Sequence, residues 1–236
     1  LIQDLLKDHF VYGWTATDTD VMGNTVGDYL FGRERPIHRT TIVQSVDQGE
    51  IVPFKNIVVE THLNPEQKIY VSGNRDFTEE EMQLLIQIAG RDEVAFKTFY
   101  GYEDVDTGAR LRDMNSIWYT AGIAHADHVA GRLNDMFGKD YAMAVNGQTR
   151  KRELSTIIDA HRRGEIPALV NADLLIEGFD SPPTEVAMML RPTRSPVIAE
   201  QTGGRILRID PENPSKVGYI VTLIDEGRWD VIPFGV

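Results

Sequence analysis

The sequence predicts an α/β fold from residue 114 onward, with a parallel sheet covered by helices on both faces. Two observations lead to this prediction: short apolar runs alternate with amphipathic stretches, and the connections between them are short. Helices are expected at 123–138 and 150–164, the second with Thr149 as N-cap, and a short helix is expected before the last strand. The expected strands cover 116–121, 141–145, 167–171, 185–190 and 218–224.

The first third of the chain is less regular. A capping box of Thr78 and Glu81 predicts a helix over 78–90, and Gly49 predicts the end of a helix over 40–49. Turn-forming residues at 100–113 predict a mobile connector. The other expected elements are a helix over 1–10 and strands over 11–17, 56–63 and 67–71.

Composition sets the broad class of protein. The chain has 236 residues, 42% hydrophobic and 25% charged, which suits one large domain or one domain plus a fragment of another. It has no cysteine, which excludes disulfides and thiolate metal sites, and it begins with Leu1, which predicts a piece of a longer protein. No apolar run approaches the roughly 20 residues of a membrane span, so a cytoplasmic protein without a membrane partner is expected.

The net charge limits the ways in which the chain could bind nucleic acid. A formal charge of −12 argues against a surface that coats nucleic acid indiscriminately. It leaves room for a local basic groove, because particular side chains rather than the average charge meet the phosphates.

Three short stretches suggest chemistry: "GWTATD" (13–18), "VNADLLIEGFDSP" (170–182) and "QTGGRILR" (201–208). The last places Arg205 and Arg208 three residues apart behind a glycine pair, which points to an anionic ligand near an approachable backbone. Each stretch alone is also typical of an ordinary turn or a solvated helix face. In this order, on a strand–helix scaffold, they resemble motifs III, V and VI of superfamily 2 helicases, closest to the DEAD/DEAH-related DNA helicases of repair and restriction systems.

The resemblance implies a domain organisation. Residues 1–24 would be the tail of a first RecA-like lobe with motif III, 25–113 a connector and variable region, and 114–236 the C-terminal RecA-like lobe. The segments 116–134 and 144–149 resemble motif IV and a following nucleic-acid-binding turn. The implied function is an ATP-dependent helicase or translocase that acts on DNA or RNA, and this resemblance favours DNA.

The resemblance also implies roles for residues around ATP. Arg208 would be the arginine finger on the γ-phosphate, with Arg205 in support and Gln201 orienting the loop or reaching the nucleotide beside Gly204. Asp180, with Gly178, would face the ribose or the cleft, and Glu177 is a coupling candidate. Thr15 and Thr17 would couple ATP to movement, although Trp14 and Asp18 depart from the family pattern.

Nucleic acid would be held through its phosphates, where open α/β sheets place their ligands, at the carboxyl ends of the strands. The candidates are Thr149, Asn171, Asp173 and Arg191. Asp173 cannot grip a phosphate itself, so it would position N–H groups or a neighbouring donor. A solvated surface position is the alternative for Arg191.

No P-loop is present in the sequence. The only Gly-Lys pair, Gly138–Lys139, is followed by Asp140 in the setting of a helix end, so it does not fit G-x-x-x-x-G-K-[ST]. ATP and Mg²⁺ would therefore be bound mainly by a separate N-terminal lobe, and this chain alone should not hydrolyse ATP. Asp225 and Glu226 follow an apolar strand, as the acidic residues of a Walker-B motif do. They come after motif VI, however, so 218–224 is expected to be the last strand of the lobe.

Two alternatives remain open. His125 and His128, three apart on a helix, could bind a metal, but no third ligand is apparent, and surface histidines are favoured; no metal site is expected. A degenerate RecA-like lobe serving as a protein-interaction scaffold is the alternative function. A nucleotide-binding dehydrogenase is disfavoured because no G-x-G-x-x-G follows a strand.

Overall fold

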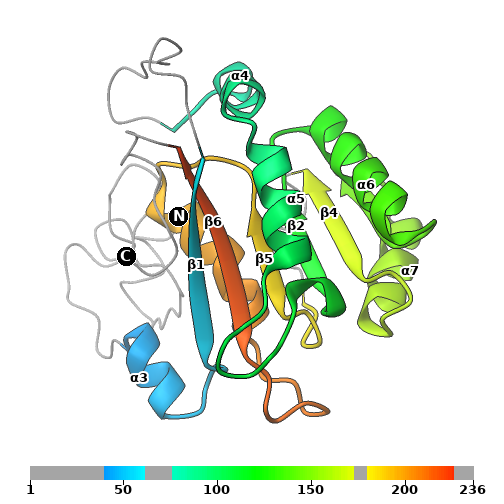
Figure 1. The fold of residues 1–236 in the computed structure, drawn as a ribbon. Helices are drawn as coiled ribbons and strands as arrows, with labels where there is room; N and C mark the ends of the chain where they lie inside the picture. The colour runs from blue at the N-terminus through cyan, green and yellow to red at the C-terminus, as the bar shows by residue number, and fades with distance from the viewer. Residues whose placement is uncertain (1–39, 62–75, 173–179, 226–236) are drawn as a thin grey trace, which may run out of the picture.

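The computed structural model describes residues 40–61, 76–172 and 180–225, which are built around a six-stranded parallel sheet (Figure 1). Its spatial order is β1-β6-β5-β2-β4-β3, and every neighbouring pair is parallel. The predicted α/β fold is confirmed. The strands are β1 (Phe54–Thr61), β2 (Ser116–Tyr119), β3 (Ala142–Asn146), β4 (Ala168–Ala172), β5 (Val186–Met189) and β6 (Gly218–Asp225).

Helices cover both faces of the sheet, as the alternation of strands and helices predicted. One face packs against α5 (Arg91–Gly101) and α6 (Ile123–Phe137), where Trp118 of β2 lies 5.0 Å from the ring of Phe99. The other face packs against α7 (Lys151–Arg162), and against the short 3-10 helix η3 (Gly204–Leu207) that continues α8 (Pro196–Gly203). Ile117 and Tyr119, the neighbours of Trp118, belong to this second core because successive side chains of a strand point to opposite faces.

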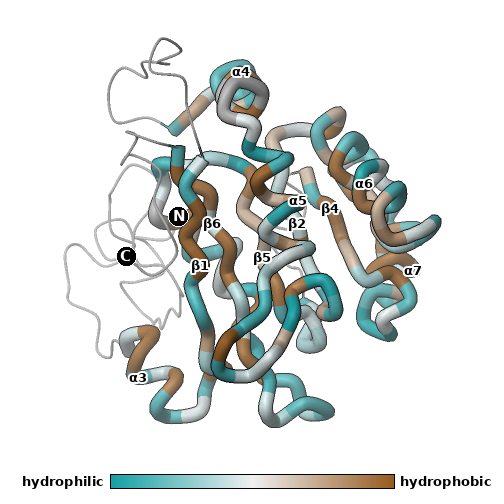
Figure 2. The backbone as a smooth tube through the Cα atoms, in the orientation of Figure 1, coloured by the Kyte–Doolittle hydropathy of each residue, from teal (hydrophilic) through white to brown (hydrophobic). Residues whose placement is uncertain are grey.

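The central strands carry almost no polar surface. Every residue of β2, β4 and β5 is buried, which is typical of parallel strands covered on both faces. Figure 2 shows these apolar segments inside a more hydrophilic shell of helices and loops. The hydrophobic core therefore stabilises the sheet, and side chains that bind ligands are expected at the strand ends.

The described residues between 54 and 113 (54–61 and 76–113) also pack with this sheet. Strand β1 pairs with β6 along eight positions, and α5 packs on the core around Trp118. The expected connector at 100–113 contains the 3-10 helix η1 (Leu111–Asp113), and its buried Asp104 accepts a hydrogen bond from Lys55 of β1 at 2.8 Å. The domain boundaries themselves stay predictions.

Several local predictions can be compared with the structure. The capping box of Thr78 and Glu81 is confirmed at the start of α4 (Glu79–Ala89), and a second helix, α3 (Ile42–Asp47), lies in the predicted range 40–49. The prediction of Thr149 as N-cap is wrong: Arg150 is the N-cap residue of α7, because the Thr149 hydroxyl accepts from the Asn146 N–H instead. The elements expected at 1–10, 11–17 and 67–71 lie outside the described residues.

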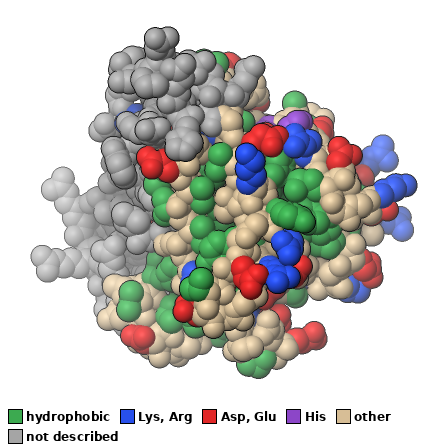
Figure 3. All heavy atoms as spheres, viewed as in Figure 1, with side chains coloured by type: hydrophobic (Ala, Val, Ile, Leu, Met, Phe, Trp, Pro, Cys, Tyr) green, Lys and Arg blue, Asp and Glu red, His purple; other side chains and the backbone are tan. Residues whose placement is uncertain are grey.

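The surface over α5 and α6 carries both signs of charge. Figure 3 shows acidic and basic side chains interspersed on this face, with histidines beside them. Arg132 pairs with Glu93 at 2.8 Å there, across the two helices. Within the described ranges, no helix has the length and apolar character needed to cross a bilayer.

Candidate nucleotide and nucleic-acid sites

Two residues that the sequence assigned to the nucleotide form an ion pair. Arg208 follows η3, and its Nη1 lies 2.5 Å from Oδ1 of Asp180. The side chains remain 43% and 51% exposed respectively, so a ligand could approach either of them. The structure thus brings together a motif V carboxylate and a motif VI guanidinium.

Three basic side chains hold the segment that contains Asp180. Arg162 of α7 donates from Nε and Nη2 to the Asp180 carbonyl, with 3.1 Å for the Nε contact. His161, also of α7, donates from Nδ1 to the Ile166 carbonyl and accepts from the Thr184 hydroxyl, each at 2.8 Å. Lys216 donates to the Pro182 carbonyl at 2.5 Å.

Burial controls the protonation of two of these groups. It lowers the pKa of His161 to about 4, against the opposing effect of the hydrogen bond to Ile166. It also lowers the pKa of Lys216 to about 8, against the attraction of the Glu185 and Asp210 carboxylates. His161 is therefore neutral at physiological pH, while Lys216 titrates near it.

The rest of motif VI lies on α8 and η3. Ser195 caps α8 through the Ile198 N–H at 3.4 Å, and Pro196 occupies the first turn, where its missing N–H costs nothing. Gln201 on α8 and Arg205 on η3 are both half-buried. A Cβ added to Gly204 would meet nothing within 4 Å, so this backbone is open to a close approach.

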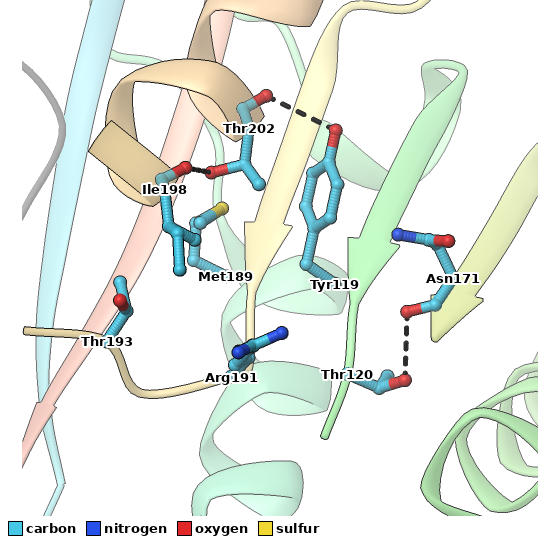
Figure 4. A pocket seen from close by; sticks show the side chains of 8 residues that line it. All are labelled: Tyr119, Thr120, Asn171, Met189, Arg191, Thr193, Ile198 and Thr202. Atoms are coloured by element: carbon cyan, nitrogen blue, oxygen red, sulfur yellow. Dashed lines mark hydrogen bonds between the residues drawn. The ribbon is translucent and has the colours of Figure 1, made fainter. Parts of the chain in front are cut away.

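A separate pocket opens at the carboxyl ends of β2, β4 and β5 (Figure 4). It contains two of the predicted nucleic-acid residues, Asn171 and Arg191, and the second points inward between the strands. Thr120 closes one side by donating from its N–H and its hydroxyl to the Asn171 carbonyl, both at 3.0 Å. The lining residues are Tyr119, Thr120, Asn171, Met189, Arg191, Thr193, Ile198 and Thr202.

Tyr119 links this pocket to motif VI. Its buried hydroxyl donates to the Thr202 carbonyl in the last turn of α8 at 3.2 Å, a bond drawn in Figure 4. Burial raises the pKa of the Tyr119 phenol above its usual range, although the Arg205 guanidinium opposes this effect. One side chain thus lines the pocket and contacts the helix that leads to Arg205.

The loop after β5 is fixed by an aspartate from a distant part of the chain. Asp76 accepts from the Thr193 hydroxyl and from the Arg194 N–H, each at 2.8 Å. Because Thr193 lines the pocket, Asp76 helps to fix the shape of this strand-end site.

The remaining predicted site residues are placed as follows. Thr149 follows β3, but its hydroxyl accepts a hydrogen bond from the Asn146 N–H at 3.0 Å and so stabilises the turn between these two residues. Asp173, Glu177 and Gly178 lie outside the described residues, as do Thr15 and Thr17.

Two sequence features have structural explanations. Asp225 ends β6 as predicted, and its buried Oδ1 accepts from Arg91 at 2.7 Å and from Thr61 at 2.6 Å.

His125 is not a surface histidine: its side chain is 8% exposed. Its Nδ1 accepts from the Ala121 N–H and its Nε2 donates to Asp92, so both ring nitrogens are occupied.

Sequence reasoning missed several residues of these sites. The sequence placed Thr120 inside the expected strand 116–121, whereas β2 ends at Tyr119 and leaves Thr120 at the strand end, where such sheets bind ligands. Arg162, Lys216 and Asp76 hold the loops through backbone groups that are distant in the chain. Such contacts leave no local pattern in a sequence.

Comparison with known proteins agrees with this fold. Residues 103–210 match the helicase conserved C-terminal domain. A 51.5 kDa protein of a Lactococcus phage (isolate 7-9) is 29% identical over 117 residues, which are 50% of this chain and 25% of that protein. The type I restriction enzyme EcoKI endonuclease subunit of Escherichia coli (strain K12) is 33% identical over 99 residues, which are 38% of this chain and 8% of that protein.

The fold is also found among solved structures. The ATP-dependent type ISP restriction-modification enzyme LlaBIII bound to DNA superposes with a TM-score of 0.57 at 17% identity, covering 92% of this chain and 15% of that one. The chain thus spans a quarter or less of the length of the two relatives. Fold and sequence together define a RecA-like helicase lobe. Residues 103–210 carry the helicase C-terminal domain that the motifs predicted, and the fold is RecA-like.

Proposed function

We propose that this chain is the second lobe of an ATP-dependent DNA helicase or translocase. The observation that carries the proposal is the arrangement of α8 and η3, which run from the strand-end pocket to the exposed Asp180–Arg208 pair. One element thereby joins the strand-end pocket, which contains Arg191, to a guanidinium suited to a triphosphate. DNA is proposed because one relative is a restriction endonuclease subunit and one structural neighbour was solved bound to DNA.

Arg208 is proposed as the arginine finger. A guanidinium is planar, stays charged at physiological pH and can bind two phosphate oxygens at once. ATP, when bound, supplies the phosphoryl group that is transferred to water. Arg208 would stabilise the charge that develops on this group, and Arg205 and Gln201 would support the loop beside Gly204.

Asp180, with Glu177 and Gly178, is proposed to face the nucleotide from this lobe. Neither they nor the rest of the sequence supply a P-loop, so Mg²⁺ and the other phosphates would be held by an N-terminal lobe. The isolated chain would then have no ATPase activity. Thr15 and Thr17 would couple ATP to the movement of the lobes. The full-length protein is proposed to act in the cytoplasm.

The strand-end pocket is proposed to hold the DNA backbone. Arg191 supplies positive charge at the edge of the sheet where Asn171 and Thr120 also lie. Thr149 and Asp173 would extend this track along the carboxyl ends of the neighbouring strands. Such contacts bind any sequence, as a motor that moves along DNA requires.

The test replaces Arg208 by Ala in the full-length polypeptide that contains this chain. DNA-stimulated ATP turnover is expected to fall by about 10³-fold or more, because a finger stabilises the transition state, while ATP binding changes little. Arg163→Ala is the matched control, since Arg163 is exposed and pairs only locally with Glu165 at 2.7 Å. An unchanged rate in Arg208→Ala removes the finger assignment.

The same assay separates the alternatives. Stimulation by RNA but not by DNA would replace the proposed substrate. If no nucleic acid stimulates turnover, and no P-loop lies within about 200–300 residues upstream, the scaffold function gains support.

A further inference from the structure

Lys216 occupies an unusual position for a lysine. It lies two residues before β6 and is only 2% exposed. Its Nζ donates to the Pro182 carbonyl at 2.5 Å and to the Arg208 carbonyl at 3.0 Å. Both of these acceptors are backbone groups.

Packing alone gives no reason for an ammonium group at this place. Burial of a charge is costly, and an apolar side chain of similar volume is often as stabilising as a buried charged group. The lowered pKa of Lys216, about 8, reflects this cost, although Glu185 and Asp210 face the amine and favour its charged form. The ammonium group therefore contributes two hydrogen bonds, which join two backbone carbonyls.

These carbonyls belong to the two segments that meet in the Asp180–Arg208 ion pair. Pro182 lies two residues after Asp180, and the other carbonyl is that of Arg208 itself. Arg162 and His161 also hold the 180–184 segment, through Asp180 and Thr184. Among these three basic side chains, Lys216 is the one whose hydrogen bonds also reach the backbone of Arg208.

We propose that Lys216 is a positioning residue that ties the Asp180 segment to the backbone of Arg208 and so directs the Arg208 guanidinium toward the nucleotide. The inference rests on the proposed function, in which Arg208 meets the γ-phosphate. Lys216 itself touches neither the nucleotide nor DNA; it acts through the two carbonyls.

The first experiment compares Lys216→Met with the wild type in the full-length polypeptide. We expect kcat for DNA-stimulated ATP hydrolysis to fall about 10- to 100-fold, because a misplaced catalytic group costs rate even when substrate still binds. The KM for ATP should change less than about threefold, as for an interaction made mainly in the transition state. Lys55→Met is the control, because it removes a lysine that contacts the Asp104 and Asp106 carboxylates, at 2.8 and 2.6 Å, and leaves both hydrogen bonds of Lys216 in place.

A pH profile separates positioning from general stabilisation. In the wild type, kcat should fall as the pH rises through about 8, where Lys216 loses its proton and its hydrogen bonds weaken. Lys216→Arg keeps a permanent cation and should lose this alkaline decline. Glu185→Gln removes a carboxylate that favours the ammonium form, so the decline should move to lower pH.

The outcomes separate this inference from the proposed function. If Arg208→Ala is inactive while Lys216→Met keeps the wild-type kcat and pH profile, the positioning role is overturned and the finger stands. If the wild-type protein shows no DNA-stimulated turnover, the proposed function fails, and a distance measurement decides the role of Lys216.

That measurement uses spin labels at Pro183→Cys and Ile209→Cys, next to the two tethered carbonyls. The chain has no native cysteine, and any cysteine elsewhere in the polypeptide would be replaced. Lys216→Met should broaden the distance distribution between the labels, and Lys55→Met should not. An unchanged distribution in Lys216→Met would contradict the positioning role.

Discussion

The Asp180–Arg208 ion pair adds little to stability, although the proposed function places both side chains at the nucleotide. Both side chains are about half-exposed, and pairs of this kind are worth about 0–1 kcal/mol because water screens them and side-chain entropy opposes them. A weak pair is easily exchanged for another anion. A phosphate can offer Arg208 two oxygens and more charge than one carboxylate.

His161 leads to a prediction about acid stability. Its pKa is about 4 in the folded protein and about 6.5 when unfolded, so the unfolded chain binds more protons between these values. Stability should fall as the pH drops, by about 2 kcal/mol between pH 7 and pH 5 from this group alone. Urea unfolding at both pH values measures the loss.

The matched variants for this prediction are His161→Gln and His128→Gln. The first should be less stable at pH 7, because it disturbs the hydrogen bonds with Ile166 and Thr184, but should lose much less stability on acidification. His128 is 53% exposed, and replacing it leaves the hydrogen bonds of His161 in place, so its variant should keep the acid loss that His161 causes. Equal pH dependence in all three proteins would show that His161 does not govern this acid loss.

Among the elements, α8 with η3 has contacts at both candidate sites. Its Ile198 and Thr202 line the strand-end pocket, and Arg208 follows its last turn. The Tyr119 hydroxyl is a connection between this element and the neighbouring strand β2.

Tyr119→Phe should remove this connection and preserve packing. We expect a loss of about 1 kcal/mol in the free energy of unfolding, the usual worth of one hydrogen bond. DNA stimulation of ATP turnover should fall more than turnover without DNA, because the pocket is then less firmly joined to motif VI. The measurement is the ratio of the two rates in the full-length polypeptide.

Tyr219→Phe is the control for that variant. Its hydroxyl donates to Asp104 at 3.1 Å, near the start of β6 and away from the pocket. It should lose similar stability but keep the wild-type stimulation ratio. If both variants change this ratio equally, general destabilisation explains the effect and the connection through Tyr119 has no special role.

At the scale of the whole molecule, a buried network joins the region before residue 114 to the rest of the sheet. Arg91 of α5 donates to Asp225 of β6, and to the carbonyls of Leu190 and Leu223 at 3.1 Å each. The Arg91 and Asp225 side chains are both 0% exposed. Thr61 of β1 completes the network.

Arg91→Met should therefore destabilise the protein by about 3–5 kcal/mol, because it leaves the Asp225 carboxylate buried without its cation. Adding Asp225→Leu should recover part of this loss, since the uncompensated charge is then gone as well. Denaturant unfolding of the single and double variants measures both effects. A double variant that is less stable than Arg91→Met would contradict this electrostatic explanation.

The sequence predicted most of the sheet because its strands are buried on both faces and read as continuous apolar runs. Thr78 and Gly138 also marked helix ends correctly, since capping depends on neighbouring residues. The pairing of β1 with β6 could not be predicted in the same way, because it joins residues more than a hundred positions apart. The motifs suggested Arg205, Arg208 and Asp180, whose roles stay predictions, whereas Lys216 and Asp76 act on distant backbone atoms.

The resting partner of Arg208 has a consequence for selectivity inside a cell. Free phosphate and other small anions are abundant there, and a bare guanidinium would attract all of them. Because the Asp180 carboxylate already contacts Arg208, an incoming anion gains only the difference in free energy between its own contact with Arg208 and that of the carboxylate. In the proposed function, a phosphate presented by a second lobe would have the advantage in this exchange, and Asp180 would keep smaller anions from binding Arg208.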